Sequence, residues 1–357
     1  EYEIIDTGIF DHDEYFDIFI EYAKIHFDDI LIRISVTNRN KVKAPLVILP
    51  TLWYRNNWSW GYNKYKPNLT TTYRGQIDIE HDKLVMKKLY SRNKDVKILF
   101  CDNETNTEKL YGKKSSNKYF KDGINNRIIN KKNTVNPKNF GTKAAFVIDT
   151  EIEAGETKTF DFRLSPHKME NAFFDFDDVF ETRKVEANEF YGEIQKDIVD
   201  EDEKNVQRQA FAGLLWNKQF YHYNIAKWLK GDPNFPVQRD FNNHVRNTEW
   251  KHMHNKDIIS MPDKWEYPWF ATWDLAFHCV SFSIIDPDFA KNQLQLLTKE
   301  WYMHPNGQLP AYEWDFSDVN PPVHAWSTFR VFKIDEKIKG RPDLAFLESV
   351  FQKLLLN

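Results

Sequence analysis

The sequence predicts a multi-domain chain in which an antiparallel β-sandwich is followed by an α-helical domain. Apolar residues recur with a period of two up to about Ser165, and at three- and four-residue steps from about Phe173. The first period is typical of half-buried strands, and the second is typical of amphipathic helices. A length of 357 residues allows two domains of ordinary size. We therefore expect a sandwich at 1–166, a helical linker at 167–200 and a helical domain at 201–357.

Strict alternation marks the strands of the first region. The stretch 32–37 alternates isoleucine and valine with arginine, serine and threonine, and 160–165 alternates phenylalanine and leucine with polar residues. Alternation of this kind indicates antiparallel sheets with one solvated face. The stretch 113–141 is rich in asparagine and lysine, and it is predicted to be a long surface excursion.

Helical spacing and capping signals define the second region. Apolar stripes with helical spacing lie at 176–194, 206–215, 275–285, 324–337 and 344–355. Asp286 and Pro287 predict the start of a further helix that runs to about Trp301, because aspartate accepts from free N–H groups and proline suits the first helical position. The last stripe continues to Asn357, so we expect the helical domain to be interrupted there.

Composition argues against several classes of partner and cofactor. With 49 basic and 53 acidic residues the net charge is -4, which gives no electrostatic argument for nucleic acid or an anionic membrane. No apolar run reaches the length of a membrane span. Cys101 and Cys279 fall in different regions, and the histidines lack metal-ligand spacing, so we expect no disulfide, metal or other cofactor. A cytoplasmic location is favoured over secretion.

The stretch 265–278 is the densest candidate site. Three tryptophans, one tyrosine and two phenylalanines surround Asp274 where a helix is predicted to start. Aromatic rings that enclose a carboxyl group disfavour its charged form, which suits a general acid near neutral pH. The structural alternative is that Asp274 only begins the helix, while Trp269 and Trp273 belong to the core.

The stretch 301–314 is the second candidate. It joins two predicted helices and mixes hydrogen-bonding groups with aromatic faces, a composition typical of a sugar pocket. The candidate ligands of a sugar there are Gln308, Tyr312, Glu313 and Trp314. The alternative is an ordinary long loop made rigid by prolines. Because both stretches connect helices, we expect them to line one end of a helical barrel.

These motifs carry a resemblance to a known family. The sequences PWFATWD at 268–274 and WYMHPNGQLPAYEW at 301–314, with RQAFAGLLW at 208–216 and SMPDKWE at 260–266, resemble glycoside hydrolase family 63. The resemblance spans roughly residues 205–335. It implies a β-sandwich followed by an (α/α)6 barrel that hydrolyses α-glucosidic bonds with inversion and without a cofactor.

The resemblance also implies roles for individual residues. Asp274 occupies the position of the family's general acid, and Trp269 falls where a ring packs against the glucose; Trp273 is grouped with it as substrate-binding. The loop from Gln308 to Trp314 falls where the family contacts the sugar. The family's general base lies far downstream and has no counterpart here. We therefore expect the first half of a barrel, with no turnover from these residues alone.

Several partners and activities remain open at this point. The expected substrate is a carbohydrate, and the missing half of the barrel is expected from a second polypeptide or from self-association. One alternative is another (α/α)6 carbohydrate enzyme, such as a trehalase-like enzyme or a phosphorylase. Another is a non-catalytic sugar-binding or scaffold protein. Glu313 is the nearest carboxylate that could serve as a base, although its family position favours substrate contact.

Overall fold

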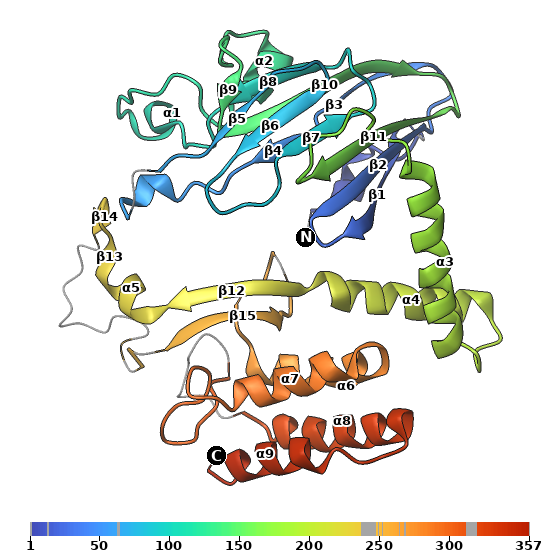
Figure 1. The fold of residues 1–357 in the computed structure, drawn as a ribbon, viewed down its shortest axis with the longest axis vertical. Coiled ribbons are helices and arrows are strands. Elements are labelled where there is room, and N and C mark those ends of the chain that lie inside the picture. The colour runs from blue at the N-terminus through green and yellow to red at the C-terminus, as the bar shows by residue number, and fades with distance from the viewer. Residues whose placement is uncertain are drawn as a thin grey trace. The chain divides into compact units, whose positions relative to one another are not determined.

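The chain divides into two compact units, Glu1–Ala187 and Asn188–Asn357. The computed structural model describes residues 2–12, 14–62, 65–236, 248, 250–251, 253–263, 265–267, 269–311 and 320–356. The first unit, called the β unit below, is built from sheets, and the second, the helical unit, mostly from helices (Figure 1). The predicted order of a β region followed by a helical region is thus confirmed. The division falls within α3 (Phe176–Ile194), inside the predicted linker.

A seven-stranded antiparallel sheet is the larger sheet of the β unit. In spatial order its strands are β1 (Phe16–His26), β2 (Asp29–Asn38), β11 (Thr157–Ser165), β7 (Lys88–Ser91), β6 (Gln76–Glu80), β5 (Asn68–Thr70) and β9 (Phe140–Gly141). The alternation seen in the sequence lies in β2 and β11, where Ile34, Val36 and Phe162 are buried in the core. Arg33 and Arg163 alternate with them and occupy the opposite face, as the pleat requires.

A smaller antiparallel sheet supplies the other side of the core. It consists of β3 (Ala44–Ile48), β10 (Lys143–Ile152), β4 (Thr51–Trp53) and β8 (Lys97–Cys101). Phe100 and Phe146 of this sheet belong to the same cluster as Leu69 and Phe162 of the larger sheet, and the rings of Phe146 and Phe162 stack at 5.5 Å. The two sheets therefore share one hydrophobic core.

Short helices decorate the β unit: η1 (Ile4–Thr7), η2 (Trp58–Trp60), α1 (Thr107–Tyr111) and α2 (Gly123–Asn130). The prediction of a mere surface excursion at 113–141 is wrong for α2. This helix buries Ile124 against Leu99, Cys101 and Ala145 of β8 and β10. Its apolar contact rests on the two isoleucines Ile124 and Ile128, which lie one helical turn apart.

The outer face of the large sheet contains buried charge pairs. Arg163 is only 2% exposed, and its guanidinium donates to both carboxylate oxygens of Asp29 at 2.9 and 2.7 Å and to Asp175 at 2.8 Å. Arg33 pairs with Asp161 at 3.0 Å and lies 5.0 Å from the ring centre of Phe176 in α3. The bidentate pair of Arg163 with Asp29 compensates a charge that would otherwise be costly to bury.

After the end of α3, the helical unit continues with α4 (Glu201–Trp216) and an unpredicted strand pair. Strands β12 (Lys218–Asn224) and β15 (His254–Ser260) pair antiparallel, and α5 (Ile225–Lys230) and the short pair β13 (Gly231–Asp232) and β14 (Phe235–Pro236) lie between them in sequence. One face of β12 packs on the core through the half-buried Tyr221 and Tyr223, while Phe220 on the other face is exposed. Aromatic residues thus occur on both faces, so the sequence lacks the apolar alternation that would indicate a strand.

The part of this unit that the structure describes after β15 contains the helices α6 (Thr272–Ile285), α7 (Pro287–Leu297), α8 (Val323–Lys339) and α9 (Leu344–Leu354). Helix α6 packs on α7 and α8, and α9 packs on α7 and α8. The predicted start of α7 is confirmed, because the Asp286 side chain accepts from the Phe289 N–H at 3.0 Å and Pro287 is the first helical residue. The helix ends at Leu297, before Trp301, and the next residue, Thr298, binds the Gln295 carbonyl through its hydroxyl.

A buried ion cluster joins three of these helices. The Lys291 amine of α7 lies 2.9 Å from Asp335 of α8 and 2.7 Å from Asp343, which caps α9. Asp335 is fully buried and Lys291 is 8% exposed. The hydrogen bonds to both carboxylates raise the pKa of Lys291 against the opposing effect of burial. The amine is therefore charged and links the helices at neutral pH.

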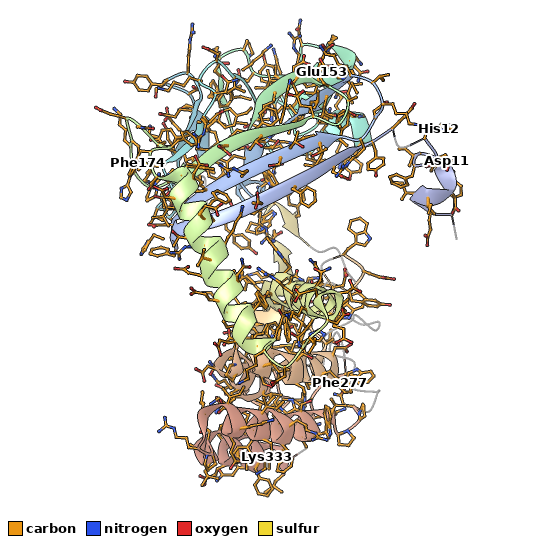
Figure 2. The ribbon with its side chains drawn as sticks, turned by 90° about the vertical axis from the view of Figure 1, so that its right-hand side faces the viewer. Asp11, His12, Glu153, Phe174, Phe277 and Lys333 are labelled. Atoms are coloured by element: carbon orange, nitrogen blue, oxygen red, sulfur yellow. The ribbon has the colours of Figure 1, made fainter. Side chains whose placement is uncertain are left out.

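Helices α6 and α8 carry exposed aromatic residues, which we call the α6–α8 aromatic face: Trp273, Phe277, Trp326 and Phe329. These residues are 39%, 46%, 45% and 53% exposed, respectively. The ring of Phe277 lies 6.2 Å from that of Trp273 and 5.7 Å from that of Trp326, so it joins the two helices. Phe277 lies at the surface of the helical unit in Figure 2. This face is an apolar surface that no described residue covers.

Each unit contains one cysteine, and both cysteines are free and fully buried. Burial raises the pKa of the Cys101 thiol to about 12, and it also raises the pKa of Cys279. None of the helices in the described part of the chain is long and apolar enough to cross a membrane.

Candidate functional site

The start of α6 is hydrogen-bonded to the end of the second candidate stretch. The backbone N–H of Thr272 donates to the Ala311 carbonyl at 3.3 Å, and its hydroxyl donates to the Pro310 carbonyl at 2.6 Å. Thr272 is 1% exposed, so these bonds are shielded from water. The stretch 265–278 and the described part of 301–314 therefore lie side by side at one end of the helical unit.

A tight turn shapes the second stretch. The His304 N–H donates to the Gln308 carbonyl at 2.9 Å, and the Asn306 side chain accepts from the Gln308 N–H at 2.9 Å. Gly307 has a φ of 92°, and a Cβ atom at this position would lie 2.0 Å from the Leu356 carbonyl oxygen. Only glycine fits such a turn without strain. The turn fixes the backbone of Gln308 next to the residues that bind Thr272.

Asp274 lies in the first turn of α6 and is half-buried. The N-cap residue is Ala271, and α6 has no side-chain capping bond. Within the described part of the chain the Asp274 carboxylate forms no hydrogen bond or ion pair, so it does not act as the cap. The carboxylate is therefore partly open to solvent at the first turn of the helix.

His278, one turn after Asp274, is its titratable neighbour. The Nδ1 atom of His278 lies 2.9 Å from the hydroxyl of Ser260, which is 1% exposed at the end of β15. Burial lowers the pKa of His278, and the negative charge of Asp274 opposes this effect. The imidazole is therefore neutral at pH 7 and is oriented by Ser260. The sequence contained one signal for the proximity of the two side chains, the spacing of four residues between Asp274 and His278 on a helix.

The aromatic residues of the stretch 265–278 differ in their exposure. Trp269 is half-buried, with its ring 5.2 Å from that of Tyr267 in an edge contact. Trp273 is 39% exposed and belongs to the α6–α8 aromatic face, whereas Trp265 is 91% exposed. Tyr267 and Phe277 are exposed as well, and enclosure of the Asp274 carboxyl group by rings stays a prediction.

A cavity of about 320 Å³ opens next to these segments. It is lined by Thr272, Trp273, Leu309, Asn320, Pro321, Pro322, His324, Ala325 and Leu354. Both candidate stretches thus contribute to its wall. Asp274 is not part of the lining, and Gln308 is half-buried next to Leu309. The predicted contacts Tyr312, Glu313 and Trp314 lie outside the described residues.

Metal-binding groups are sparse in the described ranges. No cluster of three or more histidine, cysteine or acidic side chains that could hold a metal ion occurs among those residues. One close approach of two such groups in the helical unit is across β12 and β15, where the Nε2 atoms of His222 and His254 lie 3.4 Å apart. Two ligands fall short of the three or four that protein metal sites ordinarily use.

Comparison with known proteins identifies one long relative. The chain is 41% identical to "Uncharacterized protein YMR196W" of Saccharomyces cerevisiae over 405 aligned positions that include all of this chain. The chain spans about 37% of the length of that relative. No family model matches the sequence.

A solved structure gives a much weaker likeness. The chain is similar to "Polysaccharide Lyase BACCELL_00875" with a TM-score of 0.26 and 8% identity, over 94% of this chain and 55% of that one.

Proposed function

We propose that this chain is part of an inverting glycoside hydrolase that acts on α-glucosidic linkages, with Asp274 as the general acid. One observation carries the proposal: the Thr272 hydrogen bonds bring the start of α6 and the segment 308–311 together. The proposed acid is then on the same end of the unit as Trp269, Trp273 and Gln308, the proposed sugar contacts. The resemblance of these two segments to family 63 assigns the same roles.

The proposed architecture is an antiparallel β-sandwich followed by the first half of an (α/α)6 barrel. The shared core of the two sheets supports the first part. The packing of α6 on α8 and of α7 on α9, with α6 followed directly by α7, supports the second part, because barrels of this type place alternate helices in two layers. The α6–α8 aromatic face is then the side that the remaining helices would cover.

The chemistry requires two carboxylates. In inversion one group protonates the glycosidic oxygen while the other activates water on the opposite side of the sugar, across a gap of about 6.5–9.5 Å. Within the described residues no hydrogen bond or ion pair occupies the Asp274 carboxyl group, so it is available to contact a substrate. We propose that the general base comes from outside these 357 residues, in a second polypeptide or a further segment, and that the chain alone has no turnover.

The deciding experiment is Asp274→Asn in a protein that contains both halves of the proposed barrel. We expect the release of glucose from maltose or a glucosylglycerate to fall by about 10²–10⁴, because asparagine cannot donate the proton. NMR of the first product should show β-glucose before mutarotation. Glu300→Gln, an exposed carboxylate elsewhere in the helical unit, is the control and should retain the rate.

Other outcomes identify the competing functions. Activity of Asp274→Asn within about threefold of the parent protein would remove Asp274 from the acid role. Turnover that depends on phosphate would identify a phosphorylase, and release of trehalose-derived glucose alone would identify a trehalase-like enzyme. Binding of glucosides without any release of glucose would identify a sugar-binding protein.

A further inference from the structure

The β unit contains a cavity that is far in sequence from Asp274 and that no sequence pattern predicts. Its volume is about 580 Å³, which lies within the range of small-molecule sites. Its walls come from the turn before β6, from the strands β6 and β7, and from the segment that follows β11. The lining residues are Tyr73, Arg74, Gly75, Gln76, Tyr90, Ser91, Lys94, Lys168, Met169, Glu170, Asn171, Ala172 and Phe173.

The floor of this cavity is the outer, polar face of the large sheet. Gln76 of β6 and Tyr90 of β7 are register partners on this face, while Ile77 and Leu89 point into the core. Gln76 is 7% exposed, and its Nε2 atom donates to the Asp78 carboxylate. Within the described residues its Oε1 atom accepts no hydrogen bond. A buried amide is thus held with one acceptor available to a ligand.

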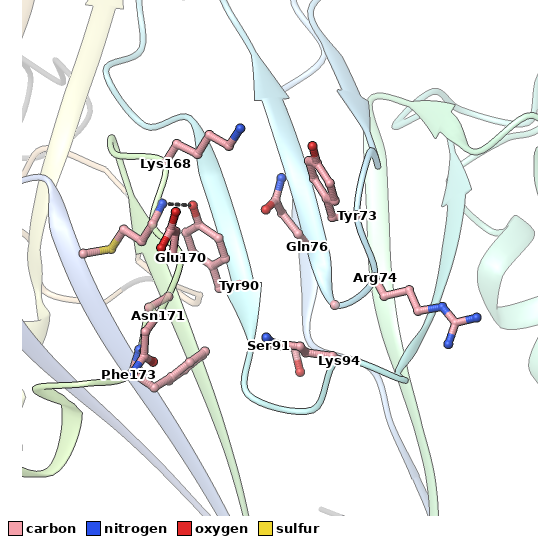
Figure 3. A pocket seen from close by; sticks show the side chains of 13 residues that line it. Tyr73, Arg74, Gln76, Tyr90, Ser91, Lys94, Lys168, Glu170, Asn171 and Phe173 are labelled. Carbon is pink, nitrogen blue, oxygen red and sulfur yellow. Dashed lines mark hydrogen bonds between the residues drawn. The ribbon is translucent and has the colours of Figure 1, made fainter.

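The wall opposite Gln76 is fixed to the sheet by Tyr90. The Tyr90 hydroxyl donates to the His167 carbonyl at 3.0 Å and accepts from the Met169 N–H at 2.9 Å. Figure 3 shows Lys168, Glu170, Asn171 and Phe173 on this segment, across from Tyr73 and Gln76, with Arg74 extending away from them. The cavity is therefore a built concavity between anchored segments.

The free polar groups of the cavity include both donors and acceptors. Lys94 and Lys168 form no ion pair with any described residue, and Glu170 and the Oε1 atom of Gln76 likewise have no hydrogen-bond partner there. An anion would satisfy the lysines but would be repelled by Glu170, and it could not donate to Gln76. An apolar ligand would leave the Oε1 atom of the buried Gln76 unpaired, whereas Lys94, Lys168 and Glu170 are exposed and can also bind water. Hydroxyl groups both donate and accept, so a polyhydroxylated ligand can satisfy the whole set.

Aromatic residues complete the walls. Tyr73 is 61% exposed, with the Lys168 amine 5.6 Å from its ring centre. Phe173 on the opposite segment is half-buried, with the Arg92 guanidinium 5.0 Å from its ring centre, so a sugar would pack on the ring surface that these cations leave open. The C–H faces of a sugar ring pack on aromatic rings while its hydroxyl groups form hydrogen bonds at the ring edge. We propose that this cavity of the β unit binds a short neutral saccharide, at a site separate from Asp274 and independent of its catalytic role.

Titration calorimetry of the full chain with maltotriose tests this proposal. The measurement is made in a Trp269→Ala background so that the segment at α6 does not contribute. We expect a Kd on the order of 1 mM, weakened by about tenfold or more in Tyr73→Ala and in Glu170→Ala. Both positions are exposed, so folding should persist. Tyr111→Ala, an exposed tyrosine of the same unit outside the cavity, is the matched control and should leave Kd unchanged.

A second readout locates the bound sugar. Acetylation of Lys168 by acetic anhydride, followed by mass spectrometry, should slow in the presence of maltotriose, while acetylation of Lys132 should not change. The proposal is overturned if maltotriose does not bind, or if binding persists unchanged in Tyr73→Ala. It is also overturned if inorganic phosphate or adenosine binds more tightly than maltotriose and competes with it at Lys168. Loss of glucosidase activity in Asp274→Asn would leave all of these results unaffected.

Discussion

The two units are alike in how they pair buried charges but differ in where they expose apolar residues. In the β unit, a buried arginine is matched by two aspartates, and the two sheets close one core between them. In the helical unit, Lys291 is matched in the same way, yet α6 and α8 leave a row of aromatic rings exposed. The β unit also exposes apolar side chains, because Ile18, Phe19, Ile20 and Tyr22 of its edge strand β1 are each more than half exposed. The units therefore differ in where their apolar surface lies, on an edge strand in the β unit and on the α6–α8 aromatic face in the helical unit, and either surface favours contact with a partner.

The largest expected effect is at the buried pair of the β unit. Arg163→Ala leaves Asp29, which is 5% exposed, without its bidentate partner. Breaking a buried pair on one side costs about 3–5 kcal/mol. Urea unfolding should show this loss in the transition of the β unit. Arg74→Ala removes an exposed pair with Asp95 and should change the free energy of unfolding by less than about 1 kcal/mol. Equal effects of the two changes would contradict the comparison.

The next effect depends on pH and should be confined to the helical unit. His324 is 5% exposed; its Nε2 atom lies 3.1 Å from the Leu294 carbonyl, and its Nδ1 atom has no partner among the described residues. Burial lowers the pKa of His324 from 6.5 to about 4, against the effect of the Leu294 carbonyl. The unfolded histidine binds a proton near pH 6.5 and the folded one does not, so its stabilisation is present above pH 6.5 and is lost as pH falls towards 4.

We expect the helical unit to lose up to about 3 kcal/mol across this range. Urea unfolding at several pH values, followed by tryptophan fluorescence, measures the slope. His324→Gln should flatten the slope, whereas the transition of the β unit should keep its own pH dependence in both proteins. If the slope of the helical unit is unchanged in His324→Gln, the buried imidazole is not its cause.

A smaller effect is expected at the turn of the candidate site. Gly307→Ala introduces a Cβ atom against the Leu356 backbone at a φ of 92°, which should cost about 1–3 kcal/mol. Gly340→Ala is the matched change, because Gly340 also has a positive φ but a Cβ atom added there would meet nothing within 4 Å. Calorimetric melting should show a larger decrease for Gly307→Ala. A larger decrease in melting temperature for Gly340→Ala than for Gly307→Ala would mean that the backbone of the turn shifts at little cost to accommodate the added methyl group.

The smallest effect on stability should come from the α6–α8 aromatic face. Phe277→Ser and Trp326→Ser remove exposed rings and should shift the free energy of unfolding by about 0.5 kcal/mol or less. The same changes should reduce self-association of the chain, as measured by light scattering after size-exclusion chromatography. Phe332→Ser, on the buried side of α8, should instead destabilise the unit strongly. Strong destabilisation by Phe277→Ser would show that this face is already covered.

Local signals in the sequence predicted the helices well. The cap and proline at Asp286 and Pro287 define the start of α7 because both act within one turn of chain. The strand pair of β12 and β15 was missed because it depends on pairing between residues from 30 (Asn224 and His254) to 42 (Lys218 and Ser260) positions apart, without apolar alternation in β12. Helix α2 was missed because only two isoleucines in a polar stretch carry its apolar contact.

The sequence identified the two segments of the candidate site but not the contacts between them. The hydrogen bonds from Thr272 to Pro310 and Ala311 join residues nearly 40 positions apart. Contacts over such a separation leave no local pattern in the sequence. The contact of His278 with Ser260 joins residues 18 positions apart and leaves no local pattern either. The expectation that rings enclose Asp274 stays a prediction, because proximity in sequence does not fix the direction of a side chain. Trp265 shows this, since it points into solvent.

The two buried cysteines allow the opening rate of each unit to be measured separately. A thiol reagent attacks only the thiolate form, and neither Cys101 nor Cys279 can reach solvent or ionise while its surroundings remain closed. The rate at which each thiol is labelled therefore reports how often its unit opens. Peptide mapping after labelling would separate the two rates within a single sample, so a sugar or partner that closes the helical unit would slow the labelling of Cys279 alone.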